Sequence, residues 1–136
     1  MKLCMAGLDW RVPISLREGL SFTKSQVVEL DRRIWRHPAV EGCVLLSTCN
    51  RTELYLSCGA GAAPDPAALL CEAAGADPAP FAAAFERAEG QDAARRLMEV
   101  AGGLRSQIWG EDQILTQVKG ALTAAREAGT ADGVLE

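Results

Sequence analysis

Cys49 is the residue of this chain best suited to nucleophilic chemistry, because polar residues surround it. Thr48 precedes it, Asn50 and Arg51 follow it, and apolar runs lie on both sides of this group. Polar residues between two strands are typical of a turn, which would expose the thiol. The Arg51 guanidinium would favour the nucleophilic thiolate, and Thr48 and Asn50 could donate hydrogen bonds to a developing oxyanion.

A simpler interpretation of the same group stays open. Arg51 could be an ordinary surface arginine, and Asn50 could be present because asparagine suits a turn. The only histidine, His37, is not adjacent to Cys49 and is expected to close a helix C-terminus. The sequence therefore predicts no Cys–His pair.

The other four cysteines are predicted to be small buried hydrophobes. Cys4 and Cys43 lie in strand-like apolar runs, Cys71 lies in an apolar helical stretch, and Cys58 follows a strand. The total of five is odd, no Cys-x-x-Cys pair occurs, and the spacings match no zinc site. We therefore expect reduced thiols, a cytoplasmic location and no metal.

The turn that carries Cys49 is predicted to join two strands, 42–47 and 52–57. The first run is apolar almost throughout, and the second alternates between apolar and polar residues. Another apolar run predicts a strand at 2–8. The two neighbouring strands are too close in sequence for a crossover helix, which disfavours a doubly wound parallel sheet.

Several helices are predicted around these strands. Thr23 and Gln26 have the spacing of a capping box, and the helix that they begin ends before Pro38. Asp65 is predicted to cap a second helix, with proline at its first position. The segment 81–89 is ambiguous between helix and strand.

From Gln91 the apolar spacing is helical as far as Gly129, with a junction at Gly110. Three or four strands with helices on one face predict an α+β fold, for which the ferredoxin-like split β-α-β sandwich is the natural candidate. Residues 1–90 would form this sandwich, and residues 91–136 would form a C-terminal helical annex.

The net charge of −4 argues against strong non-specific binding to RNA. A local basic strip could form from Arg11, Arg32, Arg33 and Arg36, although a solvated helix face is the simpler interpretation. No apolar run approaches the roughly 18 residues of a membrane span. We therefore expect no membrane partner.

The run 46–55, Leu-Ser-Thr-Cys-Asn-Arg-Thr-Glu-Leu-Tyr, resembles the nucleophile signature of glutamyl-tRNA reductases. The segment 7–22 is similar to the opening of that family through Gly-Leu, Pro, Leu-Arg-Glu and Phe. The segment 103–119 is similar to its second signature through Gly-Leu-Arg-Ser and Gly-Glu-Asp-Gln-Ile-Leu-Thr-Gln-Val-Lys. The middle, 59–90, adds nothing to the resemblance.

The resemblance implies a function. The family forms a cysteine thioester with the glutamyl group of glutamyl-tRNA and reduces it with NADPH to glutamate-1-semialdehyde, a precursor of tetrapyrroles. Cys49 would be the nucleophile and Arg51 would hold the glutamyl carboxylate. The residues expected to bind the substrate are Thr48, Asn50, Arg51, Ser106, Glu111 and Gln113. Glu53 and Glu111 also match motif positions without an assigned role, and Arg96 is a further candidate site residue whose role is likewise unassigned.

Some positions depart from the family pattern. Trp10 and Arg96 stand where the family usually has histidine, and Arg105 stands where it has aspartate. No Gly-x-Gly-x-x-Gly motif occurs, so the chain has no dinucleotide-binding unit of its own, and the family's dimerisation domain is not represented either.

We therefore expect a monomeric domain excised from a homodimeric reductase, with glutamate-1-semialdehyde aminomutase as a candidate partner. The alternative is a degenerate, non-catalytic paralogue that binds glutamyl-tRNA or a tetrapyrrole-pathway partner as a regulator.

Overall fold

A computed structural model describes residues 2–59, 63–102 and 113–130. Its single sheet contains β1 (Lys2–Leu8), β2 (Val40–Ser47), β3 (Thr52–Cys58) and β4 (Glu86–Glu89), in the order β2-β3-β1-β4. All three pairings are antiparallel. Consequently β1 and β2 run in the same direction with β3 between them. The strands predicted at 2–8, 42–47 and 52–57 are confirmed.

Two helices cover one face of the sheet. The capping box of α2 (Lys24–Trp35) is formed as predicted: Gln26 donates its backbone N–H to the Thr23 hydroxyl, and Thr23 donates its own to the Gln26 side chain. Asp65 caps α3 (Pro66–Ala74) through the backbone N–H of Ala67. Apolar side chains of both helices pack on the alternating strand residues that face them, among them Val27, Leu30, Ile34, Leu45, Leu54, Leu56 and Leu70.

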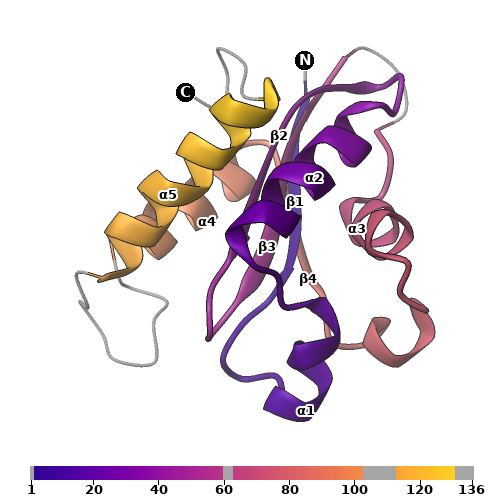
Figure 1. Ribbon diagram of the computed structural model, residues 1–136, viewed down its shortest axis with the longest axis vertical. Coiled ribbons are helices and arrows are strands. Elements are labelled where there is room, and N and C mark those ends of the chain that lie inside the picture. Colours follow the sequence, from indigo (N-terminus) through magenta and orange to yellow (C-terminus); the bar gives the residue numbers. More distant parts are fainter. Residues whose placement is uncertain (1, 60–62, 103–112, 131–136) are drawn as a thin grey trace.

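The opposite face is covered too, by α4 (Gln91–Ala101), with α5 (Gln113–Ala128) along β2 (Figure 1). Two smaller clusters form there, one around Val44, Leu46 and Val100 and the other around Met5 and Tyr55. The prediction of helices on one face only is therefore wrong. It failed because every residue of β3 is buried, including the polar ones that made the strand look half-exposed.

Short elements link the main ones. The connector after β1 contains α1 (Ile14–Arg17) and the 3-10 turn η1 (Glu18–Leu20), which the sequence did not predict. Thr52 donates its hydroxyl to the Leu20 carbonyl at 2.6 Å, which fastens this connector to the start of β3. The ambiguous segment 81–89 resolves into the end of η2 (Ala79–Phe81) and then β4.

Gly129 ends α5 with a positive φ of 79°, a conformation that suits glycine. The next residue, Thr130, is buried and contacts Cys43 of β2. Its carbonyl accepts the Cys43 N–H at 2.8 Å, and its hydroxyl donates to the Cys43 carbonyl at 2.9 Å. These bonds fix the end of α5 against β2.

Candidate functional site

The turn between β2 and β3 is held together by Thr48. Its backbone N–H donates to the Arg51 carbonyl at 2.8 Å, and its hydroxyl oxygen accepts the N–H groups of Asn50 and Arg51 at 3.1 and 3.2 Å. The predicted tight turn is confirmed, and Cys49 lies at its exposed tip. Thr48 therefore has a structural role at the site besides any contact with a ligand.

Cys49 is the accessible thiol of the chain. The other four cysteines are buried, as predicted. Burial, with a smaller contribution from Cys58, raises the pKa of Cys4 to about 12, and burial also raises the pKa of Cys58 and Cys71. Burial thus disfavours the thiolate form of these three cysteines, whereas Cys49 is exposed.

A cavity of about 190 Å³ lies beside Cys49. It is small compared with the roughly 300–1,000 Å³ of pockets for drug-sized ligands, so it suits a group of amino-acid size. One wall comes from the connector and the other from the turn and the start of β3. The wall residues are Ile14, Arg17, Glu18 and Ser21 on the first side and Thr48, Cys49, Arg51 and Thr52 on the second.

Arg17 joins the two walls. Its Nε donates to the Val12 carbonyl at 2.8 Å, and its Nη1 donates to the Cys49 carbonyl at 2.6 Å. The sequence placed Arg17 in a segment that resembles the family but gave it no role. The available signal was a charged pair, Arg17-Glu18, in a connector that otherwise had no assigned structure.

Arg51 is not a surface arginine, because its side chain is only 1% exposed. Its Nη1 lies 3.6 Å from Oε2 of Glu53, which is fully buried. At this separation the two charges attract each other without a direct hydrogen bond. Arg51 thus lines the cavity from its inner side, with a carboxylate close to its guanidinium.

Arg96 of α4 lies in the same buried layer. Its Nε donates to Glu53 Oε2 at 3.1 Å, its Nη2 is 2.9 Å from the same oxygen, and its Nη1 pairs with Glu86. Burial alone would lower the pKa of Arg96, but Glu53 and Glu86 outweigh it and raise that pKa. The two residues without an assigned role, Glu53 and Arg96, are therefore partners of each other.

Further charges extend this layer toward the connector. Arg11 makes a bidentate contact with Asp9 and also pairs with Glu86. Burial would raise the pKa of Asp9, but the hydrogen bonds and charge of Arg11, with Arg96, lower it overall. On the other side, Tyr55 donates its hydroxyl to Glu53 at 3.2 Å. The network links the connector that follows β1 with β3, β4 and α4.

The remaining predicted site residues are described only in part. Asn50 is half-buried, beside Cys49 in the turn. Ser106 and Glu111 lie outside the described residues, and so does Arg105. Gln113 begins α5, but its side chain is not described.

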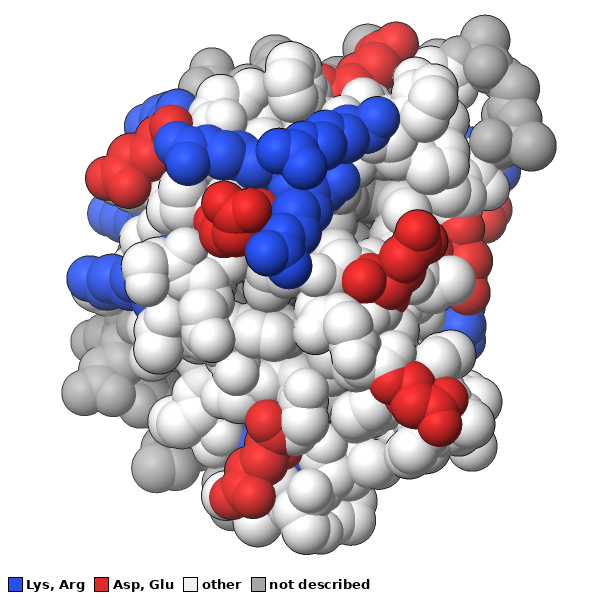
Figure 2. Space-filling view, turned by 45° about the vertical axis from the view of Figure 1, so that its right-hand side comes forward, with Lys and Arg blue, Asp and Glu red and all other residues white. Residues whose placement is uncertain are grey.

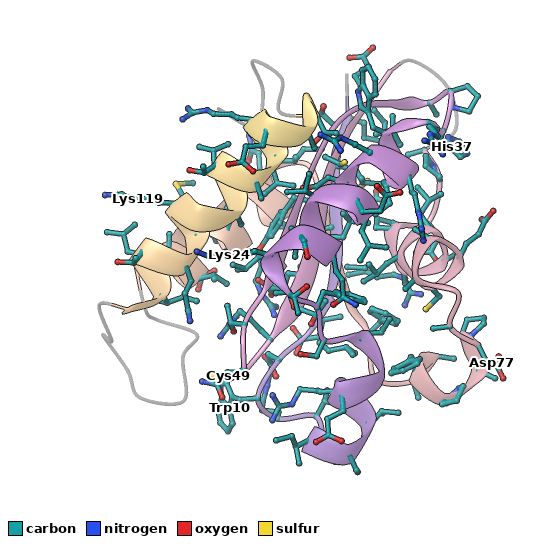
Figure 3. The ribbon with its side chains drawn as sticks, viewed as in Figure 1. Trp10, Lys24, His37, Cys49, Asp77 and Lys119 are labelled. Atoms are coloured by element: carbon teal, nitrogen blue, oxygen red, sulfur yellow. The ribbon has the colours of Figure 1, made fainter. Side chains whose placement is uncertain are left out.

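Trp10 lies at the same end of the molecule as Cys49, and His37 lies at the opposite end (Figure 3). The strand register agrees with the placement of Trp10 near Cys49, since Leu8 pairs with Thr52 at the end of the β1–β3 ladder. His37 accepts the backbone N–H of Ala39 at its Nδ1. The chain's one histidine is therefore not a base for Cys49 in this structure.

Basic side chains gather at the top of one face, with acidic side chains beside them (Figure 2). On α2, Arg33 pairs with Glu29. Among residues 2–59, 63–102 and 113–130 there is no group of three or more histidine, cysteine or acidic residues placed to hold a metal ion. Within the same ranges no helix is both long and apolar enough to cross a bilayer.

Residues 8–136 match the family model described as glutamyl-tRNAGlu reductase, N-terminal domain. The chain belongs to the glutamyl-tRNA reductase family. The glutamyl-tRNA reductases of Alkaliphilus oremlandii and Acetivibrio thermocellus are 44% and 45% identical to it over its whole length. The chain spans 41% of the length of each of these two reductases.

A solved structure, that of glutamyl-tRNA reductase from Methanopyrus kandleri, superposes on this chain with a TM-score of 0.77. The match covers 98% of this chain and 30% of that one, at 33% sequence identity. The mixed α/β fold with its antiparallel four-stranded sheet is therefore that of the N-terminal domain of a glutamyl-tRNA reductase.

Proposed function

We propose that this chain is the thioester-forming domain of a glutamyl-tRNA reductase and that Cys49 is its nucleophile. The observation that carries this proposal is the position of Cys49: it is exposed, it lies at the tip of a turn, and it lines a cavity of amino-acid size. Membership of the family supplies the substrate, the glutamyl ester of a tRNA.

In the proposed reaction, the sulfur of the Cys49 thiolate attacks the ester carbonyl carbon. A carbon–sulfur bond forms, the carbon–oxygen bond to the ribose breaks, and the ribose oxygen takes a proton from water. Thr48 and Asn50 would donate hydrogen bonds to the negative oxygen that develops meanwhile. An ester needs less help than an amide, which fits a site without a histidine beside the thiol.

NADPH, when bound by the longer enzyme, would supply the hydride that reduces the thioester to glutamate-1-semialdehyde for tetrapyrrole synthesis. This chain's residues would hold the acyl group: Arg51 through its charge, and Ser106, Glu111 and Gln113 from the annex 91–136. We further propose a cytoplasmic homodimer as the parent enzyme, with the aminomutase that consumes the aldehyde as its partner.

We also assign the sheet to the ferredoxin-like type. The order β2-β3-β1-β4, the antiparallel pairings and the succession of strands and helices from β1 to β4 support this assignment. In such a sandwich the β2–β3 turn lies at one end of the sheet, where Cys49 is found.

A second candidate function is supported by Arg96. The family usually has a histidine at that position, whereas Arg96 is engaged with Glu53 and Glu86 and cannot act as a base. A non-catalytic paralogue that binds glutamyl-tRNA as a regulator would tolerate such a change.

The test is to incubate the chain with the p-nitrophenyl α-ester of glutamate and to locate the product by mass spectrometry. We expect one glutamyl group on Cys49, none after Cys49→Ala, and an unchanged adduct after Cys71→Ala, which removes a buried thiol. Absence of an adduct from the unmodified chain, or an equal rate of ester hydrolysis by Cys49→Ala, would overturn the proposal. Binding of glutamyl-tRNA without acylation would favour the regulator.

A further inference from the structure

A second cavity, of about 400 Å³, lies where α5 runs along the outer edge of β2. It is separate from the cavity beside Cys49, because the two have no lining residue in common. Its walls come from the start of α2, the end of β2 and the middle of α5. Its volume lies within the roughly 300–1,000 Å³ that is typical of small-molecule pockets.

The α5 wall leaves room for a ligand because its residues are small. Gly120, Ala121 and Ala124 line the cavity on this side. A Cβ added to Gly120 would meet nothing beyond its own helix backbone within 4 Å, so the space beside the helix is open there. Val27 of α2 lines the same cavity and is buried, as are the two alanines. This part of the wall is therefore apolar.

Lys24 brings a positive charge to one end of the cavity. Phe22 donates its backbone N–H to the Ser47 hydroxyl at 3.1 Å, which holds the start of α2 beside the end of β2. Lys24 reaches from there toward α5, whereas Lys119 points away on the outer side of α5 (Figure 3). Among the described residues that line the cavity Lys24 alone is charged, and it forms no ion pair with any other described residue.

The outer edge of β2 adds backbone groups at the same end. Thr130 bonds both backbone groups of Cys43 on this edge. Alternate residues of an antiparallel strand face the same edge, so Ser47 presents its backbone N–H and carbonyl there too. No backbone hydrogen bond reaches this side of Ser47 from the described part of the chain. The cavity thus has a cation and an available N–H at one end and an apolar wall along the rest.

We infer that this cavity binds a small carboxylate with an apolar body, at a site distinct from that of the thiol. The carboxylate accepts hydrogen bonds from the Lys24 ammonium and the Ser47 N–H, and the hydrocarbon lies against Val27, Ala121 and Ala124. A neutral apolar molecule would leave the charge of Lys24 unused, and a dianion would lack a second cation. A monocarboxylate with a hydrocarbon chain matches both parts of the cavity.

The test uses octanoate, which has one carboxylate and a straight apolar chain, and octanamide, which has the same shape without the charge. Titration of the ¹⁵N-labelled chain, followed through amide NMR shifts, gives both the affinity and the location of binding. We expect one saturable site with a Kd in the millimolar range or tighter, as for a ligand of this size. The largest shifts should centre on Val27, Ser47 and Ala121.

Lys24→Gln should weaken octanoate binding about three- to fivefold, as expected for loss of one exposed ion pair, and should leave octanamide binding unchanged. Lys119→Gln is the matched control, because it removes the same charge from the outer side of α5. It should change neither affinity.

Gly120→Leu should fill the open space beside α5 and weaken both ligands about tenfold or more. Gly120→Ala is its matched control, since it adds only the Cβ that meets no neighbour, and it should retain the binding. Leucine and alanine both favour a helix over glycine, so both variants should fold, which circular dichroism checks.

Octanoate binding that is unchanged in Lys24→Gln or in Gly120→Leu would overturn the inference. Shifts centred on Arg17 and Cys49, or no saturable binding to the unmodified chain, would overturn it as well. Cys49→Ala should bind octanoate with unchanged affinity. The outcome is therefore independent of acyl transfer: a chain that is never acylated can still bind octanoate here, and a chain that does not bind octanoate can still be acylated.

Discussion

Arg51 and Arg96 show how a residue type can mislead about its position. Both are arginines in polar sequence contexts, yet their side chains are 1% and 7% exposed. The Glu53 carboxylate lies within reach of both guanidinium groups and offsets the cost of burying them. The sequence could not show this, because α4, which carries Arg96, is remote from β3 along the chain.

We expect Arg96→Met to lower the free energy of unfolding by about 3–5 kcal/mol, since it leaves Glu53 buried without its closest cation. Glu53→Gln should have a cost of its own, and the double variant should cost less than the sum of the two. Urea unfolding of the four proteins measures this coupling.

The rate at which a neutral reagent labels Cys49 in the same variants shows whether Arg96 also affects the reactivity of the thiol. If Arg96 is purely structural, the labelling rate should be unchanged wherever the variant is folded. Strictly additive costs would show that Arg96 and Glu53 do not interact.

The sequence signals of Cys49 were sufficient to predict its exposure, because a polar group between two apolar runs indicates a turn whatever surrounds it. They were insufficient for Arg17. This residue reaches the site through the Cys49 carbonyl, a backbone atom that leaves no trace in the sequence. The cavity beside the thiol could be predicted only with the connector folded into α1 and η1.

Helix α2 contains a titratable group on its buried face. Asp31 is fully buried beside the apolar stripe of the helix, and its backbone carbonyl accepts the Cys43 thiol at 3.2 Å. Burial raises the pKa of its carboxyl to about 7, although hydrogen bonds from Cys43 and from the Leu45 backbone oppose the shift. The capping box and Pro38 predicted this helix correctly, but they did not predict that the Asp31 carboxyl would be buried.

We expect Asp31 to make stability depend on pH. Below about pH 4 the carboxyl is protonated in both the folded and the unfolded chain. Between about pH 4 and pH 7 the unfolded chain releases this proton while the folded chain keeps it, so the folded state loses stability as pH rises. Asp31→Asn removes this loss and should add a few kcal/mol at pH 8, at about 1.4 kcal/mol per tenfold change in dissociation constant.

Urea unfolding of Asp31→Asn and the unmodified chain from pH 5 to pH 8 measures the effect. The matched control is Asp92→Asn, at an exposed position in the first turn of α4. A difference between Asp31→Asn and the unmodified chain that is constant over this range would contradict a raised pKa.

At the scale of the whole molecule, both faces of the sheet are core. The strands, the hairpin and the main helices followed from apolar runs, caps and prolines, all of which act locally. The sequence did not predict that the second face of the sheet is covered, because Glu53 and Ser57 give β3 the alternation of a half-exposed strand. Their burial depends on partners such as Arg96 that only tertiary packing brings near.

Leu45→Ala and Leu46→Ala form a matched pair on consecutive residues of β2. Leu45 packs against the α2 side and Leu46 against the opposite side, and they are 0% and 2% exposed. We expect each substitution to cost about 2–5 kcal/mol in the free energy of unfolding, because each leaves a cavity. Thermal or urea unfolding measures both, and a Leu46→Ala cost near zero would mean that the second face is not core.

Thr130 has a consequence for how this molecule meets others of its kind. β2 is one of the two edge strands of the sheet, and an edge strand can pair with a strand of another chain. Thr130 forms hydrogen bonds with both the N–H and the carbonyl of Cys43, so these backbone groups in the middle of β2 are not available to another strand. A chain shortened to end at Ala128 should therefore self-associate through β2, which concentration-dependent sedimentation would detect.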